Sequence, residues 1–292
     1  MRTLCLTVRR LLASLLSLLL LSQLVQARPA PAPLRVATYN LRFNNPGDGP
    51  NAWPNRKEMV KDLVRYYHFD VFGTQEGLRG QLTDLAELSD YAFVGHGRDD
   101  GHEAGEHSAI FYRRSRLQLL KTGDFWLSET PDRPGKGWDA TCCNRICTWA
   151  LFKDLATKQT FYFFSAHFDH QGVVARRESG KLMVRQITGI AGNAPVICAG
   201  DFNSTPDTEQ IQIMQTLLRD ARAISAAPPY GPVGTFNGFD LAAPLADRID
   251  YLFVSAGSQV LTYAALTDSL RGRYPSDHFP VVADVVLPRG AQ

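Results

Sequence analysis

The sequence predicts an α/β domain, in which strands and helices alternate along most of the chain. The first indication is a strand–helix–strand unit, formed by an apolar strand at 34–41, an amphipathic helix at 56–68 and a second strand at 70–76. The second is a buried strand at 195–201, whose apolar residues lead into Gly200-Asp201-Phe202-Asn203. The sequence also has no internal repeat or linker-like stretch, which fits one large domain.

The N-terminus has the pattern of a secretory signal. Three arginines precede a 15-residue apolar run, Leu11–Val25, and a small-residue cleavage pattern ends at Ala27. The run is shorter than the roughly 20 residues that span a bilayer, so a cleaved signal peptide over 1–27 is favoured over an uncleaved anchor. Residues 28–33 then form a Pro/Ala-rich tether, and the domain is expected over 34–288. We therefore expect the mature protein to be secreted or periplasmic.

The mature domain is nearly neutral. Removal of the signal peptide takes away three arginines and no acidic residue, which leaves 28 basic and 29 acidic residues. Electrostatic binding to nucleic acid depends on the number of phosphates that basic residues neutralise. The composition thus argues against a protein held to nucleic acid mainly by its total charge, although a neutral total is compatible with a local basic face.

Four cysteines remain in the mature chain, an even number that permits disulfides in an exported protein. Cys142, Cys143 and Cys147 lack a second ligand pair at zinc spacing, which favours a local disulfide over a metal site. The sequence leaves the pairing open. Cys198 lies within the buried strand and is expected to pack as a small hydrophobic residue.

The remaining elements follow from the same periodicities. Short helices are predicted at 79–88, 175–190 and near 207–218. Further strands are predicted at 91–95, 108–112, 117–127, 144–153, 160–166, 248–255 and 281–287. Polar or Pro- and Gly-rich loops are predicted at 97–107, 128–140 and 226–245.

Acids, amides and histidines stand at the ends of these strands or in the loops that follow. They are Asn40, Glu76, His167, Asp201, Asn203, Asp250, Asp277 and His278. Asp and Asn also cap ordinary turns, so no single one of them indicates chemistry. A glutamate at the end of an apolar strand is costly to bury unless it is paired or binds a cation, and Mg²⁺ in proteins takes one or two carboxylates. Glu76 with Asn40 is therefore a candidate magnesium site.

Six of these stretches, in order, resemble the endonuclease/exonuclease/phosphatase superfamily. They are Ala37-Thr38-Tyr39-Asn40, Gln75-Glu76, Ala166-His167, Gly200-Asp201-Phe202-Asn203-Ser204, Arg248-Ile249-Asp250-Tyr251 and Ser276-Asp277-His278. The resemblance spans most of the mature chain. It implies a four-layered αββα sandwich (DNase I-like) of two packed mixed sheets with helices outside. It also implies hydrolysis of a phosphoester by in-line attack of an activated water, with Mg²⁺ or Mn²⁺ as cofactor.

The resemblance implies a metal-binding and a water-activating group. Glu76 and Asn40 would hold the metal, with Asp277 close by. Asp201 would take the proton of the attacking water or orient it, and Asn203 would position that water and a phosphate oxygen. These roles suit phosphoryl transfer, which needs mainly positioning and charge neutralisation from the protein.

The resemblance also implies a phosphate-binding group. His167 and His278 would donate hydrogen bonds to the phosphate, and adjacent acids can hold such imidazoles cationic. Asp250 would orient His278, and Glu106 would orient His167 beside the substrate. Arg145 would contact the phosphate.

The substrate is left open by the sequence. Trp126-Leu127-Ser128-Glu129-Thr130-Pro131 and Gly137-Trp138-Asp139-Ala140 resemble a secreted bacterial branch of the superfamily that does not specify one substrate. We expect hydrolysis of a small phosphodiester or phosphomonoester, such as a sugar phosphate. The alternatives are a nuclease acting on DNA or RNA and a non-catalytic phosphate-ligand binding protein on the same scaffold. The mature protein is expected to be a monomer with no stable membrane association.

Overall fold

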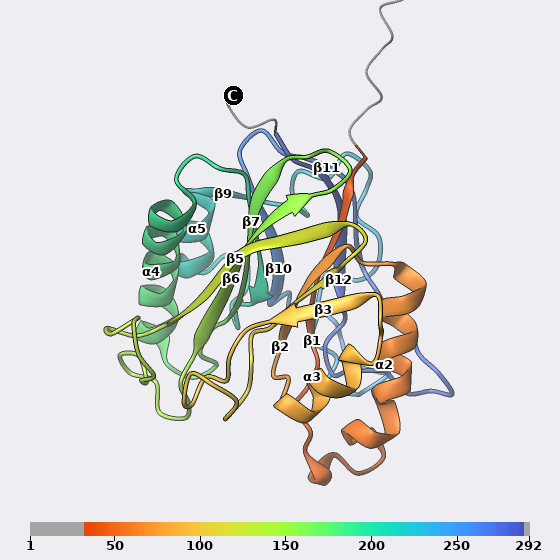
Figure 1. The fold of residues 1–292 in the computed structure, drawn as a ribbon. Helices are drawn as coiled ribbons and strands as arrows, with labels where there is room; N and C mark the ends of the chain where they lie inside the picture. Colours follow the sequence, from red (N-terminus) through yellow and green to blue (C-terminus); the bar gives the residue numbers. More distant parts are fainter. Residues whose placement is uncertain (1–31, 289–292) are drawn as a thin grey trace, which may run out of the picture. The chain divides into compact units, whose positions relative to one another are not determined.

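Two mixed β-sheets of six strands each form the centre of the fold (Figure 1). The structure is a computed structural model that describes residues 32–288, so the predicted signal peptide and most of the tether lie outside the described residues. The first sheet has the order β11 (Gln259–Ala265), β12 (Val281–Val286), β1 (Leu34–Asn40), β2 (Val71–Gln75), β4 (Ile110–Arg113), β3 (Tyr91–Val94). The second has the order β5 (Leu117–Trp126), β6 (Ile146–Asp154), β7 (Thr160–His167), β8 (Val196–Asp201), β10 (Asp250–Ser255), β9 (Leu218–Asp220).

Each sheet has one parallel pair at its centre, β1 with β2 and β7 with β8. The carboxyl ends of two parallel strands meet at the same edge, and in this register Asn40 lies opposite Gln75 while His167 lies opposite Asp201. Strand β10 is antiparallel to β8 and begins at this edge, which places Asp250 opposite Asp201. Pairing in the sheets thus gathers polar residues from distant parts of the sequence, at the edge where α/β proteins commonly bind ligands.

Helices cover the outer face of each sheet. Helices α2 (Trp53–Tyr67) and α3 (Arg79–Ala86) share an apolar core with β1, β2 and β4. Helices α4 (Val173–Ala191) and α5 (Glu209–Gln215) share another with β7, β8 and β10. Figure 1 shows the two helix pairs on opposite sides of the sheets. The predicted four-layered α/β sandwich is confirmed. Within the described residues, no helix is long and apolar enough to span a bilayer.

The two sheets pack face to face through a third apolar core, to which Val36, Phe163, Ile197 and Leu252 contribute, all fully buried. Near the polar edge the packing becomes closer and more polar. A Cβ on Gly73 would lie 2.6 Å from the Oγ of Ser165 on the facing sheet, so any larger residue there would displace Ser165. This contact brings the ends of β2 and β7 together, and with them the residues that follow each strand.

The structure corrects three of the predicted elements. Helix α5 ends at Gln215 rather than near residue 218, because residues 218–220 pair with β10 as strand β9. Strand β11 was not predicted. Helix α2 begins at Trp53, with Pro54 in its first turn, where a missing N–H costs no helical hydrogen bond. A short 3₁₀ helix, η1 (Pro46–Asn51), precedes it.

The cysteines agree with the sequence-based expectation. Cys142 and Cys143 form a local disulfide, while Cys147 and Cys198 are buried free thiols. Cys198 packs in the apolar core beneath α4. Of the three clustered cysteines, two are thus paired with each other and the third, Cys147, is a buried free thiol.

Candidate active site

Asp201, at the end of β8, lies at the centre of a buried group of polar side chains. Its carboxylate accepts hydrogen bonds from Asn40 Nδ2 at 3.0 Å and from the backbone N–H of Asn203 at 2.9 Å. Its Oδ2 also lies 3.5 Å from His167 Nε2 and 3.9 Å from His278 Nε2. Asp201 is 1% exposed. One carboxylate therefore faces two imidazoles and an amide from three other segments of the chain.

Two of the site residues adopt left-handed backbone conformations, Glu76 with φ 61° and Asn203 with φ 45°. Asparagine enters this region readily, whereas glutamate does so rarely. The Glu76 carboxylate is held by Asn40 Nδ2 at 3.1 Å and by the backbone N–H of Phe43 at 3.1 Å. The amide of Asn203 donates to the backbone oxygen of Phe168 at 3.0 Å. These contacts fix conformations of a kind that often occurs at functional sites.

His278 and Asp250 form a buried pair. The Nδ1 of His278 donates to Asp250 Oδ2 at 2.9 Å, and the two residues are 5% and 1% exposed. Burial alone would favour the neutral imidazole, but the charges of Asp250, Asp201 and Asp277 outweigh it and raise the pKa of His278 well above its ordinary value. His278 is therefore cationic at neutral pH, and its Nε2 N–H faces the site.

His167 has a different environment, and the expectation that acids hold both histidines cationic is wrong for it. Glu106 Oε2 lies 3.8 Å from His167 Nδ1, beyond hydrogen-bond distance. Glu106 instead makes a bidentate ion pair with Arg98, at 2.6 and 2.8 Å. A terminal nitrogen of Arg145 lies 3.0 to 3.1 Å from both ring nitrogens of His167. Burial, Arg145 and Arg98 together lower the pKa of His167 well below its ordinary value.

Arg145 is itself buried, at 5% exposure. Its second terminal nitrogen donates to His170 Nδ1 at 2.7 Å, and its Nε lies 3.4 Å from Asp169 Oδ2. His170 is exposed and stands at the rim of the site. Sequence reasoning did not assign Arg98 or His170 to the site. The unusual density of titratable groups in His167-Phe168-Asp169-His170 was the signal for His170, whereas Arg98 lies in a polar loop with no comparable signal.

All ten predicted site residues come together. Nine are connected by contacts of 3.9 Å or less around Asp201: Asn40, Glu76, Glu106, Arg145, His167, Asp201, Asn203, Asp250 and His278. The tenth, Asp277, precedes His278, and its neighbour Ser276 donates from Oγ to the backbone oxygen of Asn40 at 2.7 Å. Segments that lie more than 230 positions apart in the sequence are thus hydrogen bonded at the site.

The donor set fits a hard divalent cation. Burial raises the pKa of Asp201 to about 7, with a contribution from the charge of Asp250, and burial together with the charge of Glu76 raises that of Asp277. Crowded buried carboxylates of this kind are stabilised by a cation such as Mg²⁺ or Mn²⁺, which prefers oxygen ligands. Ligand atoms of Asp201, Asp250 and His278 also lie within 4.8 Å of one another, but this group could hold a metal ion only with a neutral His278.

The amide of Asn40 is turned with Nδ2 toward Glu76 and Asp201, while its Oδ1 accepts from the backbone N–H of Arg42 at 2.9 Å. In this orientation Asn40 holds the two carboxylates together as a hydrogen-bond donor. Coordination of a cation through Oδ1 would require rotation of this amide.

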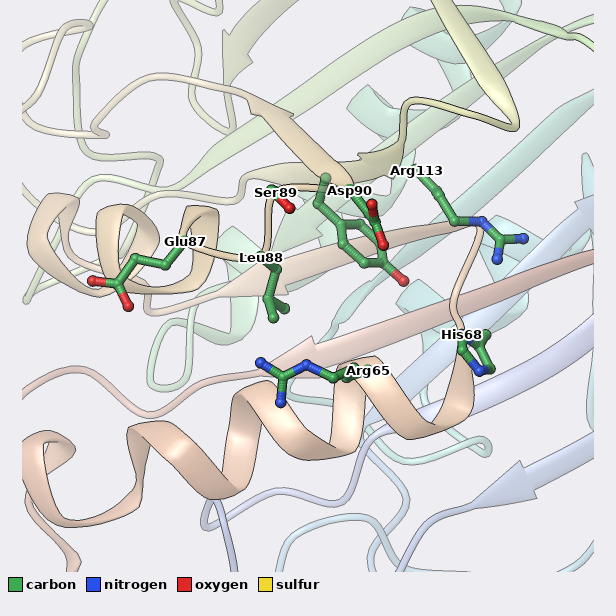
Figure 2. Close-up of a pocket in the computed structure, with 8 residues that line it drawn as sticks. Arg65, His68, Glu87, Leu88, Ser89, Asp90 and Arg113 are labelled. Carbon is green, nitrogen blue, oxygen red and sulfur yellow. The ribbon is translucent and has the colours of Figure 1, made fainter.

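A separate cavity of about 200 Å³ lies between the end of α2 and the segment that joins α3 to β3 (Figure 2). Figure 2 shows Arg65, His68 and Arg113 lining it together with Glu87 and Asp90. Its arginine and carboxylate charges balance, and none of the ten predicted site residues lines it. The cavity has no surplus positive charge for a phosphate, so the site around Asp201 is the better candidate for phosphate binding.

The sequence comparison agrees with this geometry. The profile of the endonuclease/exonuclease/phosphatase family matches residues 37–278, a range that begins in β1 and ends at His278. The chain belongs to this family. A curated relative, an uncharacterized protein of Acanthamoeba polyphaga mimivirus, is 23% identical over 215 residues. That match covers 61% of this chain, and the chain spans 31% of the length of that relative.

Several solved structures share the fold of this chain. A mannosyl-6-phosphatase of Bacteroides thetaiotaomicron VPI-5482 is 43% identical with a TM-score of 0.82, over 87% of this chain and 99% of that chain. A functionally unknown conserved protein of Enterococcus faecalis V583 is 35% identical with a TM-score of 0.82, over 87% and 100%. The human nocturnin catalytic domain, solved with a bound sulfate, is 20% identical with a TM-score of 0.69, over 88% and 95%, and indicates the fold alone.

Proposed function

We propose that this chain is a metal-dependent phosphoesterase that hydrolyses a phosphomonoester of a small molecule, with a sugar phosphate as the favoured substrate. The observation that carries the proposal is the position of Asp201 Oδ2, 3.5 Å from His167 Nε2 and 3.9 Å from His278 Nε2. In-line attack on a phosphate needs an acceptor for a proton of water and donors for the phosphate oxygens, held close together. The three side chains supply both.

Asp201 is the group that orients the attacking water and takes its proton. Hydrogen bonds from Asn40 and from the backbone of Asn203 hold the carboxylate in one orientation. The amide of Asn203 is held in turn by Phe168, so it can position the same water. A fixed acceptor of this kind converts a loosely bound water into an oriented nucleophile.

His278, His167 and Arg145 are the groups that bind the phosphate. His278 is held cationic by Asp250 and donates from Nε2, where it can also stabilise charge on the leaving oxygen. The guanidinium of Arg145 lies against His167, so it supplies the positive charge that the neutral His167 lacks. A buried arginine favours the doubly charged phosphate of a monoester.

Glu76, Asn40 and Asp277 are the residues that would hold a divalent cation, Mg²⁺ or Mn²⁺. When bound, such a cation neutralises charge on phosphate oxygens and lowers the pKa of bound water.

Two further observations support the choice of substrate and location. The 43% identity to a mannosyl-6-phosphatase extends over 99% of that chain, which favours a sugar phosphate. The nearly neutral mature chain offers little support for a duplex nuclease. The signal-like pattern of residues 1–27 supports export, so we propose that the enzyme acts outside the cytoplasm.

The test is phosphate release by the purified protein from mannose 6-phosphate, glucose 6-phosphate and p-nitrophenyl phosphate, with Mg²⁺, Mn²⁺ or EDTA. Bis-p-nitrophenyl phosphate, plasmid DNA and single-stranded oligonucleotides report diesterase activity. We expect metal-dependent release from the sugar phosphates. Asp201→Asn and Glu209→Gln, prepared identically, serve as the inactive and the active control, since Glu209 lies outside the site at the start of α5.

Metal-dependent cleavage of the diesters or nucleic acids, with none of the monoesters, would replace the proposal with that of a diesterase or nuclease. No hydrolysis of any of these compounds with either metal would refute a phosphoesterase. Activity that persists in Asp201→Asn, after a second purification has excluded a contaminant, would refute the role of Asp201.

A further inference from the structure

Arg56 is a fully enclosed arginine on α2 and is 2% exposed. Its guanidinium donates only to backbone oxygens in the contacts that the structure describes: from Nε to Asn51 at 2.8 Å, from Nη1 to Leu41 at 2.5 Å and to Pro275 at 3.0 Å, and from Nη2 to Arg42 at 2.6 Å. A buried charge is costly, and here four carbonyl dipoles stabilise it in place of a carboxylate. Such an arrangement links backbone segments rather than side chains.

Three of the four acceptors belong to the two segments that carry predicted cation ligands. Leu41 and Arg42 directly follow Asn40, and Pro275 lies two residues before Asp277. The Nη1 atom alone bridges Leu41 and Pro275, which are separated by 234 positions in the sequence. The Ser276–Asn40 hydrogen bond joins the same two segments nearer to the site.

Aromatic rings hold the guanidinium in place. Its central carbon lies 5.1 Å from the ring centroid of Trp53 and 5.6 Å from that of Phe239. Phe239 belongs to a loop that is tied to the site as well, because the backbone N–H of Asn237 donates to the backbone oxygen of Asp277 at 2.7 Å. Three segments that border the site therefore meet at one side chain.

Lysine could not reproduce this pattern. Arginine presents five N–H groups in a rigid planar fork, and here four hydrogen bonds in different directions use that fork. An ammonium group has three donors around one nitrogen and cannot reach Asn51, Arg42 and Pro275 together. The geometry requires a guanidinium, not merely a positive charge.

We propose that Arg56 is a positioning residue that sets the separation between Asn40 and Asp277, and through it the cation affinity and turnover of the site. The inference rests on the proposed function, because its catalytic part has meaning only if the site hydrolyses phosphoesters. Within residues 32–288 no hydrogen bond joins Arg56 to a predicted ligand, so its positioning effect passes through the backbone of the two segments, beside the direct attraction between its charge and Asp277.

The experiment compares Arg56→Lys with wild type and with Arg65→Lys, which lies on the same helix with a side chain that is 58% exposed. Amide exchange of residues 41–43 and 276–279 is measured in the metal-free protein, and the Mn²⁺ half-saturation concentration, kcat and KM are measured with the best substrate. In Arg56→Lys we expect exchange at least tenfold faster in both segments, a higher Mn²⁺ half-saturation and a kcat roughly 10- to 100-fold lower with a smaller change in KM. Arg65→Lys should match wild type.

Chemical rescue distinguishes the loss of the guanidinium contacts from a general loss of stability. Methylguanidinium added to Arg56→Ala should restore kcat and slow the exchange of both segments, whereas methylammonium should not. Wild-type exchange and wild-type kcat in Arg56→Lys would overturn the proposal, as would a folded Arg56→Ala that methylguanidinium does not rescue. If wild type itself hydrolyses no phosphoester, the proposed function fails, and the amide-exchange measurements still decide whether Arg56 links the two segments.

Discussion

Replacement of Asp250 by asparagine tests the charge on which the proposed mechanism depends. The Asp250 carboxylate accepts from His278 Nδ1 at 2.9 Å, and both residues are almost fully buried. Asparagine keeps the size of the side chain and removes the negative charge. The change therefore separates the electrostatic role of Asp250 from its role in packing.

The expected loss follows from the distance. At 2.9 Å, two unit charges attract each other by about 6 kcal/mol with an effective dielectric constant of about 20. A tenfold change in proton affinity corresponds to about 1.4 kcal/mol, so loss of the Asp250 charge removes the strongest influence that raises the pKa of His278 and shifts the imidazole toward its neutral form. A neutral His278 no longer offers a cationic donor, and we expect kcat/KM to fall roughly 100- to 10,000-fold.

The assay is kcat/KM for phosphate release between pH 5 and 8, for wild type, Asp250→Asn and Asp284→Asn. Asp284 pairs with Arg35 outside the site and should change kcat/KM less than twofold. Because a lowered pKa leaves more His278 cationic at acid pH, the ratio of Asp250→Asn to wild-type activity should rise as the pH falls. A near-normal rate at pH 7, or a ratio that does not vary with pH, would refute the reasoning.

Three further predictions concern the cation, the acid stability and the core. Glu76→Gln should raise the Mg²⁺ half-saturation concentration at least tenfold in a phosphate-release titration, and an unchanged value would remove Glu76 from the cation site. Burial lowers the pKa of His107, so the fold favours its neutral imidazole, and the stability that this gives is present above about pH 6.5 and is lost as the pH falls. The thermal midpoint should therefore drop between pH 7 and pH 5, and it should drop less in His107→Gln. Arg248→Met leaves the buried Asp220 without its bidentate partner and should cost about 3–5 kcal/mol in denaturant unfolding, with partial recovery in the double variant Arg248→Met/Asp220→Leu; a loss below 1 kcal/mol would contradict this.

Strand ends could be located from the sequence because their signals are local. An apolar run followed by Gly, Asn, Asp or Pro marks the point at which a strand leaves the core, and Asn40, Glu76 and Asp201 stand at such points. The parallel pairing of β1 with β2 and of β7 with β8 then brings these points together. The position of the candidate site thus follows from local pattern and elementary sheet geometry.

Two strands, β9 and β11, were not predicted from the sequence, and the structure shows why. Strand β11 contains a register shift between Val260 and Thr262, and the shift breaks the alternation of buried and exposed residues by which a strand is identified. Strand β9 has three residues, and its sequence continues the pattern of the preceding helix. Only its pairing with β10, more than thirty positions away, makes it a strand.

The sequence by itself determined the α/β class, the order of most elements and the identity of the acids, amides and histidines at the strand ends. It did not determine the charge of the two histidines, which have opposite shifts of pKa because Asp250 lies within hydrogen-bond distance of His278 whereas Arg145 lies against His167. The sequence also did not indicate that Arg56 and Arg98 lie beside the site. The two pKa shifts and the contacts of these arginines depend on burial and on partners from distant segments, and these exist only once the chain has folded.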